Sequence, residues 1–145
     1  MRELPRKLSV DELAELFEGR TPLVHALAAV DDPLGHADAV IAGLSHEDKV
    51  DALNAHPAIG ARRLSARSAA EQGEDADPVV LSELASLNRV YEAKFGFRFV
   101  VFVAGRPRRE ILDVLRGRIA RTEDEELDTG CRELVAIARD RWVRG

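Results

Sequence analysis

One histidine stands at a break in the helical pattern, and its chemistry is proton transfer. His56 is followed by Pro57, and a residue before proline is pushed away from α geometry, so we expect His56 at the end of a helix. An imidazole with the ordinary pKa of about 6.5 gives or takes a proton near neutral pH. The alternative is a histidine that only interacts with the dipole at its helix end. The local sequence leaves both interpretations open.

Glu71 is the second candidate, and it has a plain structural explanation. It ends the segment Ser68-Ala69-Ala70-Glu71, which has the form of a helix capping box and needs no ligand. Gly73 follows two residues later, so a helix that starts here has weak support. The two interpretations are compatible, because the amino end of a helix also attracts anionic ligands.

Arg141 is the third candidate, because it lies on an apolar face. Leu127, Leu134 and Ile137 form a stripe on the predicted last helix, and Arg141 follows Ile137 by four residues. An unpaired buried guanidinium is costly, so Arg141 needs an acidic partner or an anionic ligand held bidentately. The alternatives are a side chain that extends to solvent at a frayed helix end, or an ion pair with Glu71 or another acid.

The elements that must position these residues are helices. Helix-start signals recur along the chain: Ser9 with Glu12, Thr21-Pro22, Asp32-Pro33, Ser45, Asp77-Pro78, and Thr122 with Glu125. Residues 97–103 alternate like a strand, but no second strand is evident, so we expect a buried extended connector. The sequence predicts one all-α domain over residues 1–145, with about seven or eight helices.

Composition excludes several classes of function. The net charge of −5 argues against nucleic acid as a partner, which leaves a small molecule or a protein. No apolar run reaches the length of a membrane span, and the amino terminus does not look like a signal peptide, so we expect a cytoplasmic protein without membrane contact. Cys131 is the only cysteine, which excludes an intramolecular disulfide.

Other charged and metal-binding patterns carry little signal. The four histidines are ten or eleven residues apart and do not have metal-ligand spacing, so we expect no metal. No motif for a phosphate loop or a cofactor is present. The acidic runs 74–77 and 122–126, and the arginines at 106, 108 and 109, are interpreted as solvated helix starts.

Four segments in order resemble the 2-oxo-4-hydroxy-4-carboxy-5-ureidoimidazoline (OHCU) decarboxylase family. They are "AHPAIGAR" (55–62), "SAAEQ" (68–72), "NRVYEAKFGFRFVVFVAGR" (88–106) and "ELVAIARDRW" (133–142), and the likeness extends over nearly the whole chain. The resemblance implies an all-helical enzyme, usually a homodimer. It also implies cofactor-independent decarboxylation of OHCU to (S)-allantoin in urate breakdown.

The resemblance also assigns roles to residues. His56, Glu71 and Arg141 match the family's catalytic residues, with His56 as general acid/base. Glu71 would accept hydrogen bonds from substrate N–H groups, and Arg141 would hold a carboxylate or carbonyl oxygen. Further substrate contacts are implied for Pro57, Ser68, Gln72, Phe99, Val100, Val101, Phe102 and Val103.

The chain also departs from the family at three places. Arg98 stands where the family often has proline, Ala104 stands where many members have a basic residue, and the spacer from His56 to Glu71 is shorter than is common. Two alternatives stay open, and Arg98 and the short spacer bear on the second of them. One is a helical binding module without catalysis, and the other is a diverged decarboxylase for a related ureido acid.

Overall fold

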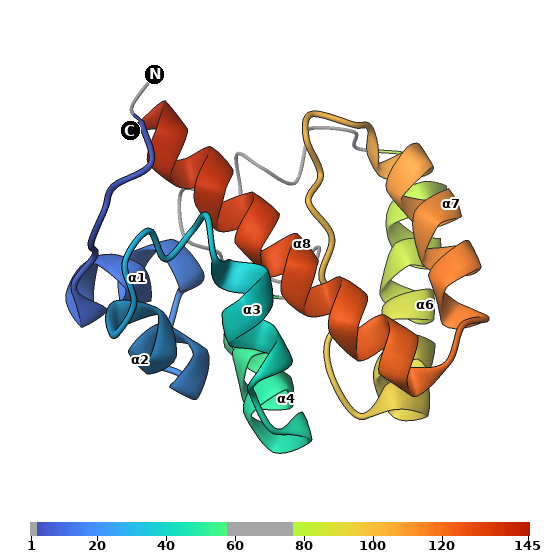
Figure 1. Ribbon diagram of the computed structural model, residues 1–145. Helices are drawn as coiled ribbons and strands as arrows, with labels where there is room; N and C mark the ends of the chain where they lie inside the picture. Colours follow the sequence, from blue (N-terminus) through green and yellow to red (C-terminus); the bar gives the residue numbers. More distant parts are fainter. Residues whose placement is uncertain (1–2, 58–76) are drawn as a thin grey trace.

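The computed structural model describes residues 3–57 and 77–145, and the regular secondary structure within them is all α-helix. The helices are α1 (Val10–Phe17), α2 (Pro22–Ala28), α3 (Ala37–Ala42), α4 (His46–Ala55), α6 (Pro78–Phe95), α7 (Arg108–Ile119) and α8 (Glu123–Arg144). α8 crosses the molecule, with α1 to α4 along one side and the α6–α7 pair on the other (Figure 1). The prediction of an all-α fold is confirmed.

Side-chain caps set where most of these helices begin. Ser9 and Glu12 form a reciprocal capping box at α1, and Thr122 with Glu125 forms another at α8. Thr21, Ser45 and Asp77 accept backbone N–H bonds at the starts of α2, α4 and α6. These bonds satisfy N–H groups that the first turn of a helix leaves without partners. The predicted starts at these five places are confirmed.

The predicted helix start at Asp32-Pro33 is wrong. Asp32 has φ +46°, a left-handed conformation, and its carbonyl accepts bonds from the N–H groups of Gly35 and His36. These bonds close a single turn, after which α3 begins only at Ala37. The Asp-Pro pair resembles a helix start in sequence, but this backbone conformation cannot continue into a helix.

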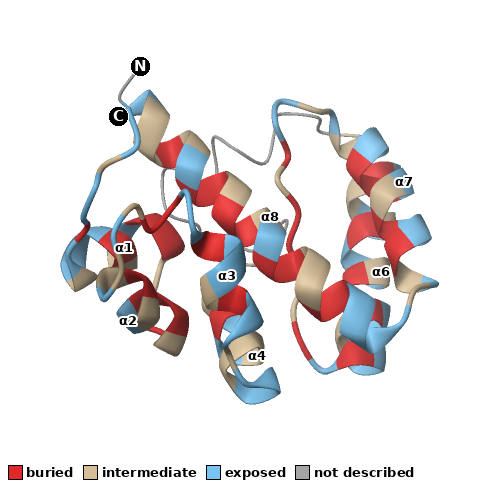
Figure 2. Cartoon of the chain, viewed as in Figure 1, coloured by how far each residue is buried: buried red, intermediate tan, exposed pale blue. Residues whose placement is uncertain are grey.

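Residues 97–103 form the predicted connector between α6 and α7. Gly96 ends α6 in the left-handed conformation with φ +81°, which glycine adopts without strain. The following backbone is extended, and most of its side chains are buried (Figure 2). Phe97 and Phe99 pack edge-on against the Tyr91 ring of α6, at centroid distances of 6.0 and 5.3 Å. Val100 is buried as well, so the alternation is not strict.

α4 and α8 approach closely beside the predicted site. Gly130 on α8 faces Leu53 on α4, and a Cβ at Gly130 would lie 2.9 Å from a methyl carbon of Leu53. A side chain there would force Leu53 to shift, between the helix that carries His56 and the helix that carries Arg141. Arg141 lies on the buried stripe of α8 as predicted, with 3% of its surface exposed.

Glu126 joins α6, α7 and α8 through one buried carboxylate. It is fully buried and accepts hydrogen bonds from the Tyr91 hydroxyl (2.7 Å), Arg118 Nε (2.7 Å) and Arg121 Nη1 (2.9 Å). Arg118 also donates to the carbonyl of Val100 at 2.6 Å, which ties the connector to the same group. The interpretation of run 122–126 as wholly solvated is therefore wrong at Glu126. Its side chain lies on the inner face of α8, beyond the capping box.

Replacing Glu126 with alanine should strongly destabilise the fold, because the buried Arg118 guanidinium would lose its carboxylate. Loss of one partner of a buried ion pair costs about 3–5 kcal/mol, measured as the free energy of unfolding in urea. Glu123→Ala is the control. Its side chain is half-exposed and pairs with His46, so it should cost about 1 kcal/mol or less. Equal losses in the two variants would contradict the role given to Glu126.

Candidate functional site

His56 ends α4, as the His-Pro sequence predicts. Its backbone leaves helical geometry with φ −80° and ψ 137°, while its N–H still donates to the carbonyl of Leu53 at 3.2 Å. Only 9% of the residue is exposed. The helix therefore delivers an imidazole into the interior, where its protonation depends on its neighbours.

The surroundings of His56 favour the neutral imidazole. Burial is the largest cause, and it lowers the pKa of His56 from 6.5 to about 4, helped by the positive charges of Arg141 and Arg98 and opposed by Glu18. Nδ1 is buried and accepts or donates no hydrogen bond among the described residues. At neutral pH the ring is therefore uncharged and ready to accept a proton.

Arg141 reaches from the end of α8 to the end of α1. Its Nη1 donates to the carbonyl of Leu16 at 2.7 Å, and its Nη2 lies 3.7 Å from a carboxylate oxygen of Glu18. The side chain is 1% exposed. An acid near the guanidinium, Glu71 or another, was one alternative from the sequence, and Glu18 is such an acid. Because Glu18 lies beside the same guanidinium, it also contributes to the charge around His56.

The connector already uses part of its backbone for hydrogen bonds within the protein. The Val100 carbonyl accepts from Arg118, and the Phe102 N–H donates to Glu133 at 3.4 Å. Arg106 donates to the carbonyls of Phe102 and Val103, so it holds the connector and does not belong to a solvated start of α7. Among the described residues, no hydrogen bond reaches the backbone groups of Phe99 and Val101.

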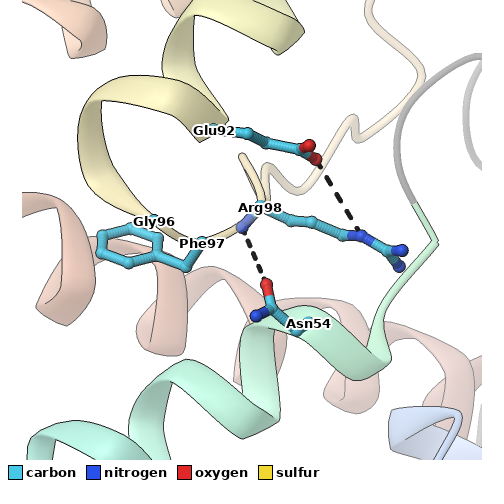
Figure 3. A pocket seen from close by; sticks show the side chains of 5 residues that line it. All are labelled: Asn54, Glu92, Gly96, Phe97 and Arg98. Carbon is cyan, nitrogen blue, oxygen red and sulfur yellow. Dashed lines mark hydrogen bonds and ion pairs between the residues drawn. The ribbon is translucent and has the colours of Figure 1, made fainter.

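A pocket of about 360 Å³ lies where the connector meets the end of α4. It is lined by Asn54, Glu92, Gly96, Phe97 and Arg98 (Figure 3). The backbone N–H of Arg98 donates to the side-chain oxygen of Asn54 at 3.0 Å, and its guanidinium donates to the carbonyl of His56 at 2.7 Å. Sequence reasoning noted Arg98 only as a departure from the family and did not identify Asn54 or Glu92.

The structure brings some of the predicted site residues together. His56 and Arg141 interact electrostatically, and half-buried Pro57 follows His56 directly. Ser68, Glu71 and Gln72 lie outside the described residues, so their predicted roles stay predictions. Within residues 3–57 and 77–145, no group of three or more acidic, histidine or cysteine side chains is arranged to hold a metal ion. No helix in this part of the chain is long and apolar enough to span a membrane.

The lowered pKa of His56 predicts a pH dependence of stability. Between pH 6.5 and about 4 the unfolded chain binds a proton at His56 that the folded chain does not. The free energy of unfolding should therefore fall by about 3 kcal/mol as the pH drops through this window. His56→Asn should lack this contribution, while His25→Asn on the exposed face of α2 should keep it. Urea titrations at several pH values measure both, and equal slopes for wild type and His56→Asn would contradict the burial of a neutral ring.

Comparison with known proteins gives one consistent result. Residues 2–143 match the family of OHCU decarboxylases. The chain is 28% identical over 141 residues to 2-oxo-4-hydroxy-4-carboxy-5-ureidoimidazoline decarboxylase of Haloferax volcanii, covering 89% of this chain and 83% of that protein. It is 31% identical over 107 residues to the uric acid degradation bifunctional protein TTL of Arabidopsis thaliana, covering 67% of this chain and 33% of that protein.

Another bifunctional relative and two solved structures extend the comparison. Identity is 20% over 152 residues to the uric acid degradation bifunctional protein PucL of Bacillus subtilis, covering 97% of this chain and 31% of that protein. The chain thus spans about a third of the length of each bifunctional relative. A crystal structure of OHCU decarboxylase in the presence of (S)-allantoin matches with a TM-score of 0.76 and 22% identity, covering 92% of this chain and 96% of that one.

A crystal structure of (S)-allantoin synthase matches with a TM-score of 0.68 and 21% identity, over 93% of this chain and 48% of that one. At these identities the two structures establish the shared fold. The family match over nearly the whole length carries the assignment, and this chain belongs to the OHCU decarboxylase family.

Proposed function

We propose that the protein decarboxylates OHCU to (S)-allantoin and carbon dioxide in the breakdown of urate. The observation that carries the proposal is His56, a buried and neutral imidazole beside Arg141, in a chain of the OHCU decarboxylase family. A neutral base next to a fixed positive charge suits a substrate that has both a hydroxyl group to deprotonate and a carboxylate to hold.

The proposed reaction requires the protein to position the substrate and to transfer protons. The bond between the ring carbon and the carboxylate breaks, and its electron pair enters the conjugated imidazoline ring. Carbon dioxide leaves, and the ring nitrogen that receives the electron pair takes up a proton from water. The hydroxyl group then gives up its proton to become a carbonyl, and a proton is added to the neighbouring ring carbon on one face. Because the substrate itself accepts the electron pair, we propose a mechanism without a cofactor.

We assign the proton transfers to His56. With a pKa of about 4 in the ligand-free protein, its ring begins the cycle as a base and takes the hydroxyl proton. The anionic substrate then raises the proton affinity of the ring, which favours keeping that proton until it is delivered to carbon. Arg141 is proposed to hold a substrate carboxylate or carbonyl oxygen. Glu71 is proposed to accept N–H bonds from the ureido group or the ring.

The remaining substrate contacts are proposed from the family resemblance. They comprise Pro57, Ser68, Gln72 and the connector residues Phe99, Val100, Val101, Phe102 and Val103. Phe99 and Val101 support this proposal best, because their backbone groups have no hydrogen bond within the described chain. We also propose that the protein is a homodimer, on the basis of the resemblance. We propose a cytoplasmic location, on the basis of Cys131, the single cysteine.

The optical activity of the product tests the proposed function. OHCU is generated in situ from urate with urate oxidase and hydroxyisourate hydrolase, and circular dichroism follows the allantoin that forms. Because OHCU also decays spontaneously to racemic allantoin, only an enzyme gives a rapid optical signal. Fast appearance of (S)-allantoin supports the proposal. Racemic product at the spontaneous rate would contradict it and favour a binding module without catalysis.

Replacing Arg141 with lysine separates its two possible roles. A lysine keeps the charge near Glu18 but cannot form a planar, bidentate contact with a carboxylate. If Arg141 holds substrate, kcat/KM should fall on the order of 10²-fold, because about 3 kcal/mol of charged hydrogen bonding is lost. Steady-state kinetics and urea unfolding measure the two effects. A loss of stability with kcat/KM unchanged would assign Arg141 a structural role, through contacts such as those with Leu16 and Glu18.

A further inference from the structure

Arg98 joins two segments that lie more than forty residues apart in sequence. Its backbone N–H donates to Asn54 Oδ1 at 3.0 Å, and its guanidinium Nη1 donates to the backbone carbonyl of His56 at 2.7 Å. Its Nε also lies 4.0 Å from a carboxylate oxygen of Glu92 on α6 (Figure 3). One residue of the connector thus holds the last turn of α4 and the residue that ends it.

The bond to the His56 carbonyl falls at the point where α4 loses its own support. Pro57 has no N–H group and ends the helix, so the chain at His56 cannot be held by continued helical hydrogen bonds. The direction of the His56 carbonyl is set by ψ of the same residue whose imidazole enters the interior. A donor that fixes this carbonyl therefore restricts how the ring is presented.

We propose that Arg98 is a positioning residue for the decarboxylation, which together with Asn54 clamps the His56 backbone against the connector. The inference rests on the proposed function, because His56 is assigned there as the proton-transfer group. A proline at position 98 would remove the backbone N–H that binds Asn54 and the guanidinium that binds His56. The clamp is therefore a consequence of the arginine in this chain.

The charge of Arg98 acts on the same ring. The charged groups around His56 are Arg141 from α8, Glu18 at the end of α1, and Arg98 from the connector. The two arginines lower the pKa of His56, and Glu18 raises it. Removing the charge at position 98 should therefore raise the pKa of His56, whereas removing the Asn54 side chain should leave that charge in place.

Three variants separate position from charge. Arg98→Met removes the guanidinium bond and the charge, Asn54→Ala removes the side-chain acceptor alone, and Arg98→Lys retains one donor and the charge. Arg116→Met is the matched control. Arg116 is a half-exposed arginine that also pairs with an acid of α6, Glu83, and its contacts within the described chain do not involve His56.

Steady-state kinetics as a function of pH, with OHCU generated in situ, provide the main readout. Arg98→Met should lose about 10–100-fold in kcat with a smaller change in KM, because displacement of a reacting group by about 1 Å has effects of this size. Its acid limb in kcat/KM should move to higher pH. Asn54→Ala should lower kcat without moving that limb, Arg98→Lys should recover most of the activity, and Arg116→Met should behave as wild type.

Two kinetic results would overturn the inference. One is an Arg98→Met variant with the kcat and acid limb of wild type. The other is a loss of kcat in Arg98→Met that Arg98→Lys does not recover, with thermal unfolding unchanged in both. An NMR titration of the His56 ring in the ligand-free protein gives a readout independent of turnover. An unchanged ring pKa and chemical shift in Arg98→Met would exclude the clamp, whereas absence of (S)-allantoin from wild type alone would count against the proposed function.

Discussion

The buried carboxylate of Glu126 is the constraint on which the arrangement of α6, α7, the connector and the start of α8 depends. A charge without solvent contact must be matched by donors, and here these come from α6, α7 and the turn between α7 and α8. Arg118 passes the constraint on to the connector through the Val100 carbonyl, and its guanidinium stacks over the Phe99 ring at 4.6 Å. An extended segment with no strand partner is thereby held in one place.

α8 then connects these elements with the other side of the molecule, where α4 carries His56. Gly130 permits the close approach of α4, and Arg141, just over four turns of helix beyond Glu126, reaches the end of α1. His56 therefore lies among groups from α1, α8 and the connector, and burial among them keeps its ring neutral. The site results from packing these elements together, and no single segment contains it.

Local signals predicted much of the fold, because capping residues act within one turn of the helix that they start. The pairs Ser9 with Glu12 and Thr122 with Glu125 are of this kind. The start of α3 was missed because a left-handed Asp32 is a tertiary outcome with no distinct sequence signal. Within the site, Arg141 could be singled out from the sequence because a charged residue interrupts the apolar stripe of α8. Glu18 and Asn54 could not be found in this way, because their importance depends on residues distant in sequence.

The central claim is that the imidazole of His56 transfers the protons in a stereospecific decarboxylation. The most direct test compares the initial rates of (S)-allantoin formation by wild type and His56→Asn under identical conditions, at pH values where both remain folded. We expect the substitution to lower the enzymatic rate by ~10²–10⁴-fold, the usual contribution of general acid–base catalysis. A variant that forms (S)-allantoin at the wild-type rate would contradict the account.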